Sequence, residues 1–365
     1  TTSFRNLVIP TLTVGFAWFT ILFLWKFKRV VITIACVVTL GGSAYFAQKF
    51  LYFSDRQFVF PAIAPIAKLQ ELAGTSRVWG YGNAYTENNL LSYFGLYSPE
   101  GYSPFFSTRY GELLGVIRTN GRVTDQINRA DVDLSPIYED QSASGNPYRT
   151  RLLSLLGVGF IMEEKTGLRK ELMKTDGRFP SGEFALVWED EQWRIWKYKK
   201  ALPRTFFTPE YEVIPDKEAG IHRLFDQNFP YNTRLILAED PFPGQSTVSA
   251  RGTAAIVRYE SSSIEINVDA SNRGLVFLSD VYYPGWQATV DGKPVKIFIA
   301  DAAFRAVPVP AGTHVVEMYY RPVSIQAGIF VTGISFTLAM FWIIRTGWRR
   351  LGKGWLLFGQ GRRQR

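Results

Sequence analysis

The sequence predicts a membrane protein with three transmembrane helices, an extracytoplasmic α/β (α+β) domain and a C-terminal antiparallel β-sandwich. Three uncharged, apolar segments predict the helices, at about 7–25, 30–48 and 322–344. Each is long enough to cross a bilayer core, which needs roughly 20 apolar residues at helical rise. Alternating helix and strand patterns predict the α/β domain over 50–245, and six or seven short alternating strands predict the sandwich over 246–321.

The distribution of charge predicts how the chain is oriented. The net charge of +9 comes from the ends, because residues 1–49 and 345–365 contain basic side chains and no acidic one. The segment between them is slightly acidic, which argues against nucleic-acid binding. Lys26, Lys28 and Arg29 lie between the first two helices, and basic loops stay in the cytoplasm. We therefore expect a large outside segment at about 50–321 and a basic cytoplasmic tail at 345–365.

The α/β domain is predicted from short local patterns. RVWGYG (77–82) and RLILA (234–238) are typical of strands, Tyr110–Ile117 and Lys217–Asp226 of helices, and LLSLLGVGFIM (152–162) of a helix that leads into a buried strand. The aromatic runs FALVW and WRIWKY (184–199) flank a charged turn and predict a hairpin.

The sandwich is predicted from period-two alternation after residue 250. The strands expected are SIEINV, LVFL (275–278), WQATV (286–290), VKIFI (295–299), FRAVPV (304–309) and HVVEMYY (314–320). Asp291-Gly292 between two of them is a strong two-residue hairpin signal.

Reactive groups are few. The two histidines, His222 and His314, are far apart and are interpreted as a surface residue and a strand-edge residue. No CxxC, HExxH, GxSxG or P-loop pattern is present, so the sequence predicts no metal site and no catalytic residue in this chain. The single cysteine, Cys36, falls within the second helix and is expected to be a packing residue.

Aromatic residues in loop-like sequence are the candidate binding residues. Beside Asn and Arg, exposed rings could stack on sugars while the polar groups bond sugar hydroxyls. The alternative is that these rings fill the core or meet the membrane interface. The candidate glycan contacts are Trp79, Tyr81, Asn89, Tyr102 and Arg109.

Two long segments carry a family resemblance. SDVYYPGWQATVDGKPVKI and FRAVPVPAGTHVVEMYYRP resemble the C-terminal signature of the bacterial YfhO-type membrane proteins. GLYSPEGYSP (95–104), RYGELL (109–114) and ALPRTFF (201–207) are similar to earlier parts of that family. The residues themselves favour structural roles, as turns and strand starts.

The resemblance implies a GT-C-fold glycosyltransferase of the bacterial plasma membrane. Such an enzyme takes a sugar from a polyprenyl-phosphate carrier and adds it to a cell-envelope polymer or lipid. The resemblance places the catalytic carboxylate in an early outside loop, for which this chain has no counterpart. Because the chain begins just before a hydrophobic segment, we expect further N-terminal helices as its partners. The alternative is a non-enzymatic, membrane-anchored protein that binds a glycan or another protein.

Overall fold

The structure, a computed structural model, describes residues 27–50, 63–84, 89–102, 107–123, 131–132, 134, 143–165, 178–245 and 249–360, with residues 11, 15–16, 18–19, 55 and 60. The chain divides into two units, residues 1–63 and residues 64–365, and each unit is described by itself.

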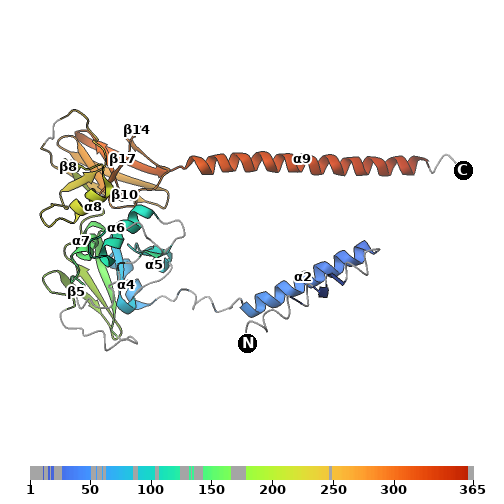
Figure 1. The fold of residues 1–365 in the computed structure, drawn as a ribbon, viewed down its shortest axis with the longest axis horizontal. Coiled ribbons are helices and arrows are strands. Elements are labelled where there is room, and N and C mark those ends of the chain that lie inside the picture. The colour runs from blue at the N-terminus through green and yellow to red at the C-terminus, as the bar shows by residue number, and fades with distance from the viewer. Residues whose placement is uncertain are drawn as a thin grey trace. The chain divides into compact units, whose positions relative to one another are not determined.

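The first unit contains helix α2 (Lys28–Phe50), which carries a candidate membrane span at Arg29–Gln48 (Figure 1). A second candidate span, Val323–Arg345, lies in helix α9 (Val323–Gln360) of the second unit. Within the described residues these two helices are long and apolar enough to cross a membrane, so the structure supports two spans and not the three expected. The span expected at 7–25 lies outside the described residues except for five positions. Helix α9 also continues into the segment expected to be a separate tail.

The first layer of the second unit combines short helices with a four-stranded sheet of order β1-β4-β6-β5, in which β1 and β4 are parallel. Its elements are α4 (Ala64–Leu72), β1 (Arg77–Tyr81), η1 (Gly82–Ala84), α5 (Leu90–Tyr93), α6 (Thr108–Arg118), α7 (Pro147–Leu155), β4 (Val158–Glu164), β5 (Phe184–Glu189) and β6 (Trp193–Tyr198). Strands β2 (Gly101–Tyr102) and β3 (Asp131–Val132) form a separate antiparallel pair.

Local sequence explains several of these elements. Helix α7 begins after Asn146, whose side chain accepts a hydrogen bond from the Arg149 amide, and Pro147 occupies the first helical turn. In the β5–β6 hairpin, Asp190 Oδ1 accepts from the Gln192 and Trp193 amides and closes the turn. The hairpin predicted at 184–199 is confirmed.

The sandwich consists of a six-stranded sheet of order β7-β12-β16-β15-β9-β8 and a five-stranded sheet of order β10-β11-β17-β13-β14. The six-stranded sheet contains β7 (Thr205–Thr208), β8 (Glu210–Val213), β9 (Arg234–Leu237), β12 (Gly274–Leu278), β15 (Phe298–Ala300) and β16 (Phe304–Val309), with α8 (Lys217–Leu224) joining β8 to β9. The five-stranded sheet contains β10 (Gly252–Tyr259), β11 (Ser263–Ala270), β13 (Trp286–Val290), β14 (Lys293–Val295) and β17 (Gly312–Tyr320).

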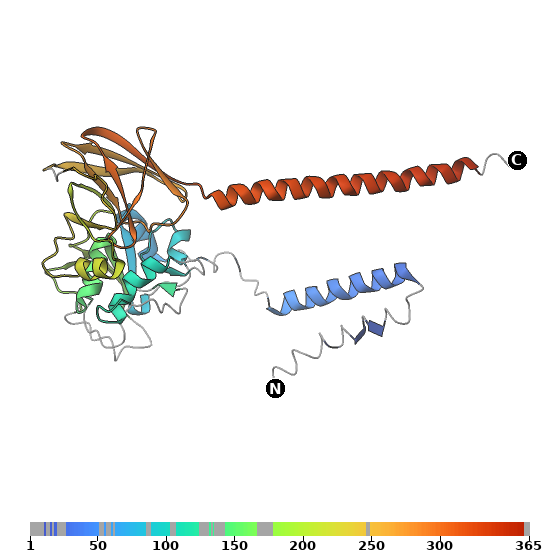
Figure 2. The same ribbon diagram turned by 45° about the horizontal axis from the view of Figure 1, so that its top comes forward.

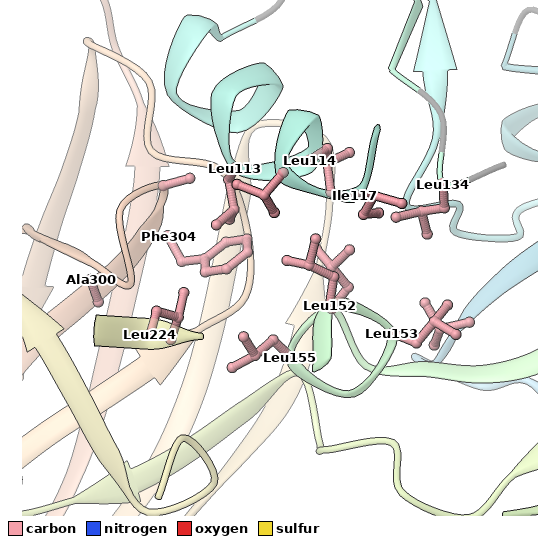
Figure 3. Close-up of a cluster of buried hydrophobic side chains, with 14 of the residues drawn as sticks. Leu113, Leu114, Ile117, Leu134, Leu152, Leu153, Leu155, Leu224, Ala300 and Phe304 are labelled. Carbon is pink, nitrogen blue, oxygen red and sulfur yellow. The ribbon is translucent and has the colours of Figure 1, made fainter. Parts of the chain in front are cut away.

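The six-stranded sheet is a middle layer with apolar side chains on both faces. Phe304 packs with Leu113 and Leu152 of the helices in one buried cluster (Figure 3). Phe277 belongs to the same cluster. The intervening residues of the same strands, such as Val276, pack against the five-stranded sheet in a second cluster. Full burial of each such side chain stabilises the fold by about 1.5–3 kcal/mol. This explains why LVFL is continuously hydrophobic, as expected of a strand that is covered on two sides.

The turn between β13 and β14 has the predicted geometry. Asp291 and Gly292 have φ values of 51° and 75°, as a type I′ turn requires at both central positions. The antiparallel pairing of β13 with β14 follows from this turn, and β13 also pairs antiparallel with β17 on its other side.

The structure differs from the expected division at residue 245 in one respect. Strands β7, β8 and β9, all before that residue, belong to the six-stranded sheet of the sandwich. The sandwich strands and the first layer lie together in Figure 2, and one hydrophobic cluster contains residues from both. The second unit therefore has a shared core on the two sides of residue 245.

Candidate functional site

Three charged side chains that are far apart in the sequence meet in the interior of the second unit. Arg77 begins β1, Arg204 precedes β7 and Asp280 follows β12, and each is less than 9% exposed. Asp280 Oδ1 accepts hydrogen bonds from Arg77 Nη2 at 2.7 Å and from Arg204 Nη2 at 2.6 Å. Tyr259 Oη donates to Asp280 Oδ2 at 2.7 Å. We call these four residues the arginine–aspartate cluster.

Further bonds and ring contacts hold the two arginines. Arg77 Nη1 donates to the Leu156 carbonyl at 2.5 Å and to Ser279 Oγ at 2.9 Å. The Arg204 guanidinium lies 4.6 Å from the ring centre of Tyr97 and 4.2 Å from that of Tyr259. Cation–π contacts of this kind strengthen when they are shielded from water. These contacts hold each positively charged guanidinium group in one orientation.

Electrostatics maintain the charged state of this cluster. Burial alone would raise the pKa of Asp280, but the nearby Arg204, Arg77 and Arg305 lower it to about 2. Burial and the Asp280 carboxylate together raise the pKa of Tyr259 to about 12. At neutral pH the carboxylate is therefore ionised and the phenol keeps its proton.

Two adjoining pockets lie beside the cluster. One, of about 410 Å³, and another, of about 380 Å³, share Arg77, Asn89, Ser98 and Glu100 in their walls. The first also has Tyr97, Arg204, Tyr259, Glu260 and Ser261, and the second Tyr102, Ser107, Tyr110 and Tyr283. We call the pair of pockets the cleft. Its lining is rich in hydroxyl, amide and aromatic groups, which suits a polar ligand with flat apolar faces.

The structure brings two of the sequence-predicted residues together in the cleft. Asn89 Nδ2 donates to the Tyr102 carbonyl at 2.9 Å, and Asn89 Oδ1 accepts from the Tyr102 amide at 3.2 Å. Both residues line the second pocket, and the Tyr102 side chain is 51% exposed. Asn89 thus holds the backbone of Tyr102, while the tyrosine ring faces solvent.

The other three predicted residues lie elsewhere. Trp79 and Tyr81 are buried in the core, with Trp79 Nε1 donating to Glu100 Oε1 at 2.9 Å. Arg109 is on α6, and its Nη1 lies 3.5 Å from the Ala302 carbonyl oxygen. Glycan contact by any of the five stays a prediction, and burial of the two rings leaves Tyr102 as the aromatic candidate among them.

Sequence reasoning missed the arginine–aspartate cluster. The sequence contains one sign of it: Arg77, Arg204 and Asp280 each adjoin an apolar strand, and a charged side chain buried there requires a partner of opposite charge. Each partner is more than 70 residues away along the chain, so no local pattern identifies it.

The histidines are placed as a helix residue and a strand residue. His222 is on α8, near Glu218, and both side chains are more than half exposed. His314 Nδ1 lies 2.6 Å from Asp291 Oδ2, and its Nε2 lies 3.1 Å from the Ala311 carbonyl oxygen. Since both partners are acceptors, both ring nitrogens must carry protons to bond them. These contacts raise the pKa of His314, the Asp291 hydrogen bond most of all.

Two buried carboxylates in or beside the cleft are held by hydrogen bonds within the protein. The Asp280 carboxylate is bonded by two arginines and a phenol, and Glu100 Oε1 accepts from the Leu134 amide as well as from Trp79. In the part of the chain that the structure describes, no three His, Cys, Asp or Glu side chains gather as a metal site would need.

Comparison with known protein families gives a match over part of the chain. Residues 241–332 match the model of a family described as bacterial membrane protein YfhO. This segment contains most of the sandwich strands, Asp280, Tyr283 and the first residues of α9. Neither the curated proteins nor the solved structures contain a match to the chain.

Proposed function

From the match of residues 241–332 to the bacterial membrane protein family YfhO, we propose that this chain supplies the extracytoplasmic and membrane portion of a glycosyltransferase. The donor is a polyprenyl-phosphate sugar, and the acceptor is a cell-envelope polymer or lipid. The cleft holds the glycan part of the acceptor outside the plasma membrane. None of the cleft residues takes part in the transfer of the sugar itself.

The chemistry of the cleft carries this proposal. A sugar offers hydroxyl groups around its rim and a less polar face of C–H groups. Tyr102 presents an exposed ring for the face, and Ser98 and Ser107 present hydroxyls for the rim. Beside these groups, the Asp280 carboxylate holds Arg77 and Arg204 of the cleft wall by hydrogen bonds.

Binding to a glycan panel tests this proposal. The full chain in nanodiscs is expected to bind envelope oligosaccharides, and Tyr102→Ala is expected to weaken binding by about fivefold or more, since stacking on an aromatic ring, as known for nucleic-acid bases, contributes roughly 1–3 kcal/mol. Tyr93→Ala is the matched control, because Tyr93 is 59% exposed on α5 and lines neither pocket. Equal affinities of the two variants, or no binding by the unaltered chain, would reject the cleft as the glycan site.

A non-enzymatic, membrane-anchored binding protein is the second candidate. The engagement of Asp280 and of Glu100 Oε1 in structural hydrogen bonds favours it, because these atoms are already bonded within the protein. Sugar transfer from a radiolabelled polyprenyl-phosphate donor, in membranes that contain the complete proposed enzyme, distinguishes the two. Glycan binding without transfer would decide for the second candidate.

A further inference from the structure

The five-stranded sheet has one end that leads to a candidate membrane span. Strand β17 ends at Tyr320, which pairs with Trp286 at the start of β13, and Tyr319 pairs with Ser263 at the start of β11. The candidate span in α9 begins at Val323. Three residues of extended chain cover about 10 Å, so this end of the sheet lies within about 10 Å of the span's first residue.

Aromatic side chains gather at this end. The ring centres of Tyr283 and Trp286 lie 6.5 Å and 5.6 Å from that of Tyr320, and Arg321 lies 5.4 Å from the ring centre of Tyr319. We call Tyr283, Trp286, Tyr319 and Tyr320 the aromatic collar. Tyrosine and tryptophan are enriched where a membrane meets water, since each ring has an apolar body and a polar group.

Gly285, which lies between Tyr283 and Trp286 of the aromatic collar, contacts the two residues that precede α9. The Arg321 amide donates to the Gly285 carbonyl at 2.8 Å, and a Cβ atom on Gly285 would lie 2.9 Å from Pro322 Cβ. Gly285 has a φ of 107°, which other residues rarely adopt. The last residues before the span therefore have a defined position relative to Tyr283.

Both pockets of the cleft have a wall at the same end of the sheet. Tyr283 of the collar lines the second pocket. Glu260 and Ser261, in the turn between β10 and β11, line the first pocket, and the next residue, Ser262, accepts a hydrogen bond from the Tyr320 amide at 2.9 Å. The opposite end of the sheet, with the Asp291–Gly292 turn, lines neither pocket.

We propose that the cleft receives the polar headgroup of a lipid from the adjacent leaflet, and that the aromatic collar lies in the headgroup layer of that leaflet. The headgroup layer is about 5–8 Å thick on each side of the hydrocarbon core, which matches the short chain between Tyr320 and the span. That the headgroup is a glycan rests on the proposed function. The position of the cleft at the bilayer surface does not.

Depth measurements test the position without any ligand. In the full chain with Cys36→Ser, a fluorophore on Tyr283→Cys or Ser261→Cys is expected to be quenched by lipids that carry a spin label on the headgroup. The control is Lys293→Cys, at the start of β14 next to the turn at the opposite end of the sheet, where no quenching is expected. Unquenched fluorophores at both cleft positions, or equal quenching at all three, would overturn the proposal.

A second measurement tests the ligand. Thermal stability of the full chain in nanodiscs is measured with glucosyl-diacylglycerol in the bilayer and with water-soluble glucosylglycerol, because a bound ligand stabilises the folded state. We expect half-maximal stabilisation at a total concentration about a hundredfold lower for the glycolipid, since confinement in the leaflet raises its effective concentration.

The possible outcomes separate this inference from the proposed function. Equal or stronger stabilisation by glucosylglycerol would overturn the lipid source and leave glycan binding in place. Stabilisation by neither compound would count against both. If quenching is found but Tyr283→Ser binds the glycolipid as the unaltered chain does, the collar does not belong to the lipid site.

Discussion

Replacement of Asp280 by Asn is expected to destabilise the second unit strongly. The amide keeps the size of the side chain but removes the charge that balances Arg77 and Arg204, two guanidinium groups that are less than 9% exposed. Loss of one partner from a buried ion pair costs about 3–5 kcal/mol, because the other charge stays buried without compensation. For a unit of this size, each kcal/mol lowers the melting temperature by about 2–4 °C, so a decrease of roughly 6–20 °C is expected.

The matched control is Glu239→Gln. It makes the same chemical change in an ion pair with Lys296, whose side chain is 57% exposed while that of Glu239 is 63% exposed. Exposed pairs contribute about 0–1 kcal/mol, so the melting temperature should change by less than about 4 °C. Tryptophan fluorescence of the full chain in detergent, followed during heating, gives both values. A decrease for Asp280→Asn no larger than for Glu239→Gln would refute the reasoning.

The same variant has an expected pH signature. The folded-state pKa of Asp280 is about 2, lower than the value of about 3.9 for an unfolded chain. Its contribution to stability is therefore complete above about pH 4 and is lost as pH falls toward 2. The difference in stability between the unaltered chain and Asp280→Asn should shrink over that range, and a constant difference would count against the ionised state.

Three further changes have distinct outcomes. The raised pKa of His314 stabilises the protein fully below about pH 6.5, and this stabilisation is lost as pH rises through the folded pKa. The midpoint of urea unfolding should therefore fall above about pH 6.5 in the unaltered chain, and His314→Gln should reduce that fall. Burial raises the pKa of Asp301 to about 7, so stability should fall as pH rises from about 4 to about 7, and this fall should be absent in Asp301→Asn. Gly285→Ala forces a side chain into a φ of 107° and should cost about 1–3 kcal/mol, measured by thermal unfolding. Gly182→Ala, which meets no atom within 4 Å, should change stability by less than about 0.5 kcal/mol, and a similar loss in both glycine variants would contradict the strain argument.

Local patterns predicted the individual elements well. The strands at 77–82 and 234–238 correspond to β1 and β9, and the helix at 217–226 corresponds to α8. The helix at 110–117 is α6, which begins two residues earlier. These elements are set by side-chain periodicity and turn residues over short stretches, and such signals are present in one sequence.

Features that depend on distant partners could not be predicted in the same way. Strands β7 and β8 are only four residues long each, and their pairing partners lie beyond 230 in the sequence. VKIFI was expected to be one strand, but Val295 ends β14 of one sheet and Phe298 begins β15 of the other. A strand that changes sheets keeps its hydrophobic pattern, so periodicity does not reveal the break.

The candidate site shows the same limit. Asn89 and Tyr102 were identified by residue type, and their contact follows from a turn and a two-residue strand. Trp79 and Tyr81 lie in the predicted strand at 77–82, and the sequence did not show that β1 is buried along its whole length. Burial of a strand depends on the layers that cover it, and those layers come from other parts of the chain.

The contribution of β7, β8 and β9 to the six-stranded sheet has a consequence for biogenesis. During synthesis, β8, α8 and β9 can pair before the rest of the sheet is made, because the two strands are parallel neighbours joined by one helix. Strand β7 has no partner until β12 arrives, and β9 has no second neighbour until β15 arrives. The nascent protein therefore passes through a stage with open strand edges, when it is most exposed to proteases and in need of chaperones.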